Sequence, residues 1–160
     1  MTHNDILRRL RFALAMGDGH VAHLIQTGGG ATLSEDDVKL RQLPDEDEAS
    51  VYCDADTLGA FLDGLILERR GPRDPSKPAP PLMVLDNNQI LKKLRIALNL
   101  HEEAMLRILD QGGHPMSKHE LTALFRKPNH KHYREAGGQV LRRFLKGLTF
   151  ELRPDAAPSS

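Results

Sequence analysis

The same helical unit occurs twice in this chain, and the duplication constrains the fold more than any other feature. Residues 4–14 align with residues 88–98, with seven of eleven positions identical and two more exchanging Arg for Lys. The similarity returns between residues 61–68 and residues 144–151, where five of eight positions are identical. Each unit spans about 65 residues. Because repeated units share a core with their neighbours, we expect the two to pack together.

Apolar residues at helical spacing predict an opening helix in each unit. One face carries Ile6, Leu7, Leu10, Ala13 and Leu14, and the second unit repeats this face with Ile90, Leu91, Leu94, Ala97 and Leu98. The spacing is that of an amphipathic helix with one buried face. Asparagine is a preferred residue at helix N-termini, so we predict Asn4 and Asn88 as N-caps.

Three further helices are predicted in each unit. The second ends at paired glycines, which suit the left-handed position after a helix. The third begins at Ser34 or Ser117, each followed three residues later by an acid, as in a capping box. The last contains Gly64 or Gly147 in its interior. An interior glycine costs about 1 kcal/mol relative to alanine, so its recurrence indicates close approach by another helix.

These elements predict an all-α fold in which a duplicated four-helix unit packs about a pseudo-twofold axis, with the last helices near the centre. The first unit covers residues 1–71 and the second covers residues 88–153. Residues 72–87 form a proline-rich linker, which is expected to be extended and semi-rigid. Residues 154–160 are predicted to form a disordered tail.

The repeated motifs resemble the YehS-like family of bacterial tandem domains of unknown function. The resemblance rests on Asn-x-Ile-Leu-(Arg/Lys)-(Arg/Lys)-Leu-Arg-x-Ala-Leu at the start of each unit and on the later Phe-Leu-x-Gly-Leu. A third part is the Glu-Arg-Arg-Gly that ends the first unit at residues 68–71. The resemblance covers nearly the whole chain. It implies an all-helical tandem protein of the bacterial cytoplasm and carries over no activity or catalytic residue.

Opposite charges are concentrated in the two halves of the chain, although the formal net charge is zero. Residues 1–71 hold 7 Lys/Arg against 13 Asp/Glu, whereas residues 88–160 hold 13 against 7. The sharpest difference falls in the loop after the third helix, where Asp45, Glu46, Asp47 and Glu48 of the first unit correspond to Asn129, His130, Lys131 and His132 of the second. Scaffold positions should recur in both units, so this divergence marks candidate functional surfaces.

The leading hypothesis is a non-enzymatic interaction or regulatory module that acts through its oppositely charged lobes. The acidic and basic halves would dock on each other, or the acidic lobe of one molecule would bind the basic lobe of the next. The candidate residues for a basic partner are Asp45, Glu46, Asp47 and Glu48. The candidates for an acidic partner or a nucleic acid are Lys118, Arg126, Lys127, His130, Lys131, His132, Tyr133, Arg134, Arg142 and Arg143.

The alternative is RNA or DNA binding by the basic second unit, whose cations and single tyrosine suit phosphates and a base. A helix-turn-helix is the less favoured form of this hypothesis, because residues 130–136 are few for a recognition helix. The acidity of the first unit would also repel the same polyanion.

Enzymatic chemistry has little support in the sequence. The eight histidines have no recognisable metal-ligand spacing, and the acidic loop lacks the central glycine and terminal glutamate of an EF-hand. Cys53 aligns with Ala136, which favours a buried thiol over a nucleophile. Glu68 and Glu151 recur and would approach each other if the last helices cross. We expect no metal, no cofactor and no catalytic residues.

Composition indicates a cytosolic protein. One cysteine cannot form an internal disulfide, which fits a reducing compartment. No apolar run approaches the length of roughly 18 residues that a membrane span needs. With aromatic residues at 4% and no tryptophan, an extended base-stacking platform has little material.

Overall fold

Four helices form in each repeat of the computed structural model, which describes residues 1–155. The first repeat contains α1 (His3–Ala13), α2 (Asp18–Thr27), α3 (Glu35–Leu40) and α4 (Ala55–Arg70). The second contains α5 (Asn87–Ala97), α6 (Glu102–Gln111), α7 (Lys118–Leu124) and α8 (Gly138–Leu152). The described residues form no strand, so the all-α prediction is confirmed. Most of the predicted tail, residues 156–160, lies outside the described part of the chain.

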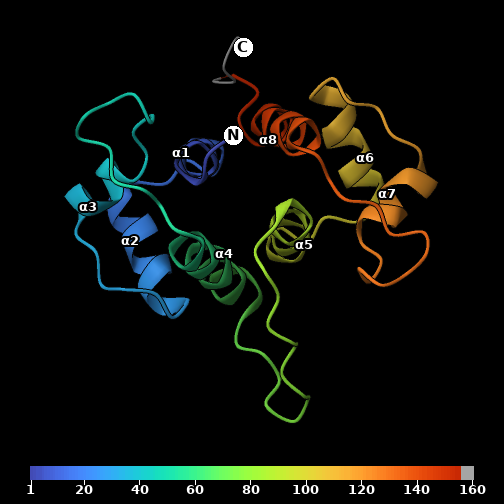
Figure 1. The fold of residues 1–160 in the computed structure, drawn as a ribbon, viewed down its shortest axis with the longest axis horizontal. Helices are drawn as coiled ribbons and strands as arrows, with labels where there is room; N and C mark the ends of the chain where they lie inside the picture. The colour runs from blue at the N-terminus through green and yellow to red at the C-terminus, as the bar shows by residue number, and fades with distance from the viewer. Residues whose placement is uncertain (156–160) are drawn as a thin grey trace.

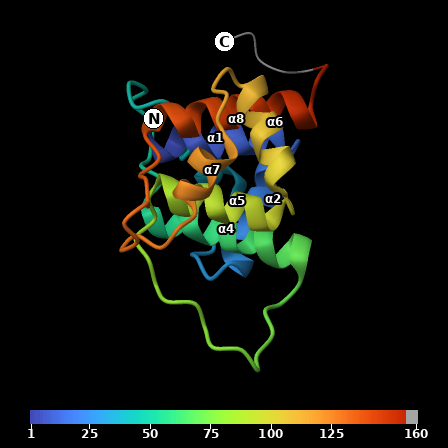
Figure 2. The ribbon, with the colours of Figure 1, turned by 90° about the vertical axis from the view of Figure 1, so that its right-hand side faces the viewer.

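The two repeats join by exchanging helix contacts. The opening helix α1 packs on α8, the last helix of the other repeat, and α5 packs on α4 in the same way. Figure 1 shows these four helices nearly end-on at the centre, with α2 and α3 on one side and α6 and α7 on the other. Figure 2 shows the same helices from the side. A pseudo-twofold axis therefore relates α1 and α8 to α5 and α4, as predicted.

This exchange buries the apolar stripes of the opening helices. Leu7 and Leu10 of α1 are completely buried, and Leu91 and Leu94 of α5 are at most 1% exposed. Because α1 has few contacts with α4 and α5 has few with α8, each opening helix depends on the other repeat for cover. A single core cluster consequently runs through both repeats.

Glycine pairs allow helix backbones to touch within each repeat. A Cβ at Gly64 of α4 would lie 1.9 Å from the carbonyl oxygen of Leu24 in α2, and a Cβ at Gly28 would lie 1.8 Å from that of Ala60. In the second repeat, Gly147 and Gly112 make the equivalent approach between α8 and α6. The predicted close approach is confirmed, and the neighbouring helix is the second helix of the same repeat.

In each pair of glycines after α2 and α6, the two residues have different structural roles. Gly28 and Gly112 lie at the helix crossings, whereas Gly29 and Gly113 adopt φ values of 96° and 88°. This left-handed region is one that residues with a Cβ rarely adopt. The predicted left-handed cap is therefore confirmed for the second glycine of each pair.

The prediction that Asn4 and Asn88 cap their helices is wrong. Thr2 and Asp86 are the N-caps, and Thr2 forms a capping box with Asp5. The capping boxes predicted at Ser34 and Ser117 are confirmed.

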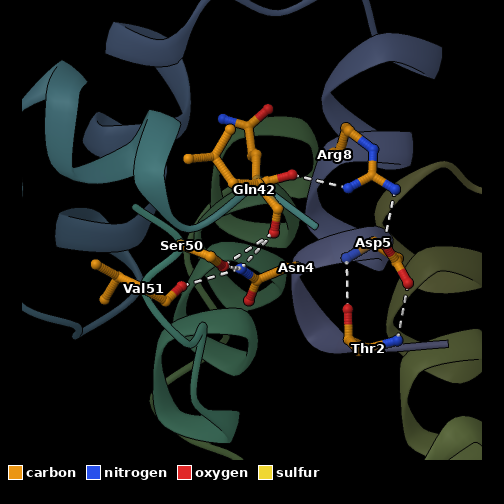
Figure 3. Close-up of polar contacts among 8 residues, drawn as sticks. Thr2, Asn4, Asp5, Arg8, Gln42, Ser50 and Val51 are labelled. Atoms are coloured by element: carbon orange, nitrogen blue, oxygen red, sulfur yellow. Dashed lines mark hydrogen bonds and ion pairs between the residues drawn. The ribbon is translucent and has the colours of Figure 1, made fainter. Parts of the chain in front are cut away.

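The two asparagines are buried and anchor the loop that precedes the last helix. Asn4 Nδ2 donates to the carbonyl oxygens of Leu43 and Val51 at 3.0 and 2.9 Å, and Figure 3 shows the bond to Val51. Asn4 Oδ1 accepts from the Cys53 amide at 2.7 Å. Asn88 repeats this arrangement: it donates to Leu124 and Arg134 and accepts from the Ala136 amide at 2.8 Å. An amide side chain suits this task because it donates and accepts at once.

The linker leaves the helical body as an exposed loop and returns at α5, where Asp86 caps the helix (Figure 1). Its side chains from Pro72 to Val84 are exposed. Residues 72–84 therefore contribute nothing to the core, whereas Leu85 at the end of the linker packs against it.

We predict that Gly64→Ala destabilises the protein by about 1–3 kcal/mol, because the new methyl group forces α2 and α4 apart. The free energy of unfolding from urea denaturation measures this. Gly138→Ala is the matched control, because a Cβ there meets nothing within 4 Å. Equal stability of the two variants would contradict the glycine contact.

We also predict that Asn4→Ala lowers the free energy of unfolding by about 1–3 kcal/mol, because it leaves the buried Cys53 amide without an acceptor. Hydrogen exchange of that amide should accelerate. Asn129→Ala, in an exposed loop position, serves as the control. Unchanged exchange at Cys53 would show that Asn4 does not hold the loop.

Candidate functional site

The two loops that diverge in charge occupy equivalent places in the fold. Each connects the third and fourth helices of its repeat and is held by the buried asparagine described above. Equivalent backbone bonds add to this anchor: the Val51 amide donates to Leu40 and the Arg134 amide donates to Ala123, both at 3.1 Å. The pseudo-twofold axis places the loops on opposite sides of the molecule (Figure 1).

The acidic loop, residues 45–48, projects four carboxylates into solvent. All four side chains are exposed, and the Asp47 amide closes a turn by donating to the Pro44 carbonyl at 3.0 Å. Asp47 Oδ1 also accepts from the Ala49 amide at 2.9 Å. Within residues 1–155, none of the four acids forms a salt bridge. Their negative charge is therefore available to a partner.

The basic loop, residues 125–134, surrounds an open depression of about 670 Å³. Four of the predicted residues lie on its wall: Arg126, Lys127, His130 and Lys131. Phe125 forms an apolar part of the wall and lies under the guanidinium of Arg95, 4.8 Å from the ring centroid. The depression thus combines cations with one aromatic surface.

Arg126 has a buried nitrogen without an acceptor. Its Nε has no hydrogen-bond partner in the described structure, and its Nη1 lies 3.4 Å from His130 Nε2. His130 Nδ1 accepts from the His132 amide at 3.0 Å, so the proton of neutral His130 is on Nε2. That nitrogen consequently offers Arg126 no lone pair. The Arg126 guanidinium is therefore not fully hydrogen-bonded within the described structure.

The other predicted cations are separated from the depression or already paired. Lys118 lies 3.7 Å from Glu102, and Arg134 lies 3.7 Å from Glu120. Arg142 and Arg143 lie on α8, and no hydrogen bond or ion pair between described residues joins them to the basic loop. Burial raises the pKa of Tyr133, and nearby Asp86 and Glu135 raise it further.

Residues 130–136 form turns and extended backbone and no helix. The helix-turn-helix hypothesis is therefore wrong, because the element that would enter a major groove is missing from the described structure. Pro128 and the two glycines at 137 and 138 explain this, since they interrupt helical backbone on both sides of the segment.

The recurrent glutamates form hydrogen bonds within their own repeats. Glu68 Oε1 lies 2.7 Å from His20 Nε2, and Glu151 binds Arg107 and Gln111. The hydrogen bond from Arg107, followed by that from Gln111, lowers the pKa of Glu151. The hypothesis that Glu68 and Glu151 approach each other is wrong, because each faces the second helix of its repeat.

Metal-ligating residues do not converge in the described part of the chain. No group of three or more His, Cys, Asp or Glu side chains in residues 1–155 is placed to hold a metal ion. His130 and His132, whose ring centroids lie 5.6 Å apart, have no third ligand beside them among the described residues.

A second basic surface was missed by sequence reasoning. Arg9 of α1 and Lys146 of α8 line a groove of about 370 Å³ between the repeats. The available signal was the variable position of Phe-Leu-x-Gly-Leu, which is Asp63 in the first repeat and Lys146 in the second. Its meaning depends on which helix faces that position, and the sequence did not reveal the exchanged packing.

The described structure defines an all-helical tandem-repeat protein with a symmetric scaffold and diverged loops. The family model described as "Protein of unknown function (DUF1456)" matches residues 3–71 and again residues 87–153, and the chain belongs to this family. A relative is "Uncharacterized protein YehS" of Escherichia coli (strain K12), 41% identical over 150 residues, which are 92% of this chain and 94% of the relative. No solved structure matches the chain. Among residues 1–155, no helix has the length and apolarity to span a bilayer.

The Cys53 thiol is predicted to be inert in the folded protein. Its side chain is completely buried, and this burial, helped by the charge of Asp54, raises its pKa to about 12. We therefore expect a thiol reagent at pH 8 to label Cys53 only at the rate of unfolding. Labelling in urea is the positive control. Rapid labelling of the native protein would contradict this burial.

Proposed function

We propose that the protein is a cytosolic, non-enzymatic interaction module that associates through its two charged loops. The acidic loop of one molecule would bind the depression of the basic loop of another. The observation that supports this proposal is that opposite charges lie at pseudo-symmetric positions. Within residues 1–155, neither the four acids nor Arg126, Lys127 and Lys131 form a salt bridge.

The symmetry supports association between copies. Equivalent surfaces with equal charge would repel, whereas equivalent surfaces with opposite charge attract when copies are arranged head to tail. Such a contact is heterologous, so it produces rings or open chains instead of a closed twofold dimer. The two loops of one molecule lie on opposite sides, which leaves both free for neighbours (Figure 1).

The chemistry of the depression supports a carboxylate as the bound group. No acid among the described residues forms a salt bridge with Arg126, and a carboxylate binds a guanidinium through two parallel hydrogen bonds. Lys127 and Lys131 on the same wall would hold a second acid. The loops are exposed, so added salt should weaken the contact between them. At physiological ionic strength, charges farther apart than the Debye length of about 8 Å are largely screened.

Two reversed-charge variants test this proposal. Glu46→Lys with Glu48→Lys leaves the acidic loop without net charge, so that only the basic loop remains charged, and Lys127→Glu with Lys131→Glu leaves the basic loop without net charge, so that only the acidic loop remains charged. Each variant alone should sediment as a monomer at low salt, whereas the wild type associates. An equimolar mixture of the two variants should associate again, because opposite loops are restored between molecules. Sedimentation velocity at low and high salt measures all three samples.

The mixture is the decisive sample, since non-specific aggregation would not be restored by pairing two defective variants. Association of the wild type that is insensitive to salt would contradict the proposal. A wild type that remains monomeric at high concentration and low salt would also contradict it.

RNA or DNA binding by the same depression is the second candidate function. The supporting observation is that Arg126, Lys127 and Lys131 line the depression, while Tyr133, a residue that could stack on a base, lies in the same loop outside its lining. Fluorescence anisotropy with a labelled single strand distinguishes this function: the Lys127→Glu, Lys131→Glu variant should lose binding, and the acidic-loop variant should gain it. The full chain must be used, because removing the first repeat would expose the apolar faces of α5 and α8.

A further inference from the structure

The groove between α1 and α8 contains two cations without partners. Arg9 and Lys146 both line it, and neither forms a hydrogen bond or salt bridge with another described residue. Both side chains are half-buried, so water solvates them only in part. Partly buried like charges are costly unless an anion lies between them.

In the equivalent contact on the opposite side of the molecule, between α4 and α5, the corresponding two residues form an ion pair. By the alignment of the repeats, Lys93 corresponds to Arg9 and Asp63 corresponds to Lys146. Lys93 Nζ lies 2.5 Å from Asp63 Oδ1, so an ion pair joins α5 to α4. At the equivalent place between α1 and α8, two cations stand where the other side has a cation and an anion. The missing negative charge is the feature that a ligand would supply.

Neighbouring charges do not neutralise the pair. Arg8 and Arg11 also line the groove, and the acids nearest to them are already engaged. Asp5 accepts from Arg8 at 2.6 Å and belongs to the capping box of Thr2, while Asp18 lies 3.6 Å from Arg11. Burial lowers the pKa of Arg9, and the charges of Arg8 and Arg142 act in the same direction against that of Asp5.

The groove also has an apolar part of limited size. Phe12 and Leu145 lie beside the cations, and Thr149 completes the lining. Arg153 joins the helices here: it donates to the Phe12 carbonyl at 2.9 Å, and its guanidinium lies 4.4 Å from the Phe12 ring centroid. A volume of about 370 Å³ is in the range of small-molecule sites and suits a compact ligand better than a polymer.

We propose that this groove binds a small organic phosphate, with Arg9 and Lys146 holding the phosphate and Phe12 contacting the apolar part of the molecule. The site is independent of the charged loops and lies at the junction of the repeats. A bound phosphate would bridge α1 and α8 as Asp63 and Lys93 bridge α4 and α5. The ligand therefore stabilises the contact between the repeats.

Isothermal titration of the full chain with inorganic pyrophosphate and with ADP, at fixed ionic strength, tests this proposal. Pyrophosphate supplies only the anion, whereas ADP adds a ring for the apolar wall and should bind more tightly. Lys146→Asp recreates the ion pair of the other side. It should weaken both probes by about tenfold or more and raise the thermal midpoint without ligand.

Two controls keep the result interpretable. Lys77→Asp causes the same change in net charge, but it lies in the linker away from α1 and α8 and should leave affinity unchanged (Figure 1). Arg9→Gln removes one charge without reversing it and should weaken both probes if Lys146→Asp does not fold. The loop variants described above should bind both probes as the wild type does.

Several results would overturn the proposal. One is the absence of binding of either probe to the wild type at millimolar concentration. Another is unchanged affinity in Arg9→Gln or Lys146→Asp. Loss of RNA binding in Lys146→Asp, with neither small phosphate bound by the wild type, would assign the groove to a polymer and exclude the small ligand.

Discussion

The contact of each opening helix with the last helix of the other repeat is the interaction on which the remaining structure depends. Hydrophobic burial favours this contact because the stripes of α1 and α5 find little cover in their own repeats. Leu7, Leu10, Leu91 and Leu94 all belong to the one core cluster that runs through both repeats. The chain is consequently one folded body with a single core, although its sequence consists of two similar halves.

Within each repeat, a second set of contacts has been preserved in both copies. Glycines at the α2–α4 and α6–α8 crossings let the backbones touch, and Asn4 and Asn88 hold the loops before the last helices. These contacts place the two loops at equivalent positions in the fold, with their charged side chains on the surface. The bonds to Val51 and Cys53 recur at Arg134 and Ala136, whereas the third bond goes to Leu43 in one repeat and to Leu124, which corresponds to Arg41, in the other.

Local patterns in the sequence predicted much of this scaffold and little of the site. Helix positions, capping boxes at Ser34 and Ser117 and the approach at Gly64 follow from spacing and residue type, which are local properties. The prediction that Asn4 is an N-cap was wrong because an asparagine near a helix start can serve either as a cap or as a buried residue that hydrogen-bonds to a distant segment. Only the distant carbonyls of Leu43 and Val51 distinguish the two roles. The recognition helix considered for residues 130–136 does not form, because Pro128 and the glycines at 137 and 138 interrupt helical backbone.

The sequence by itself determined that the protein is a helical duplication and that its halves carry opposite charge. Both properties follow from the type and spacing of residues along the chain. Only the tertiary structure decided which charges meet. The exchange of helices brings Lys93 to Asp63 on one side and places Arg9 and Lys146 in one groove on the other. Electrostatic energy depends on distance and solvation, and neither is fixed until helices remote in the chain have packed together.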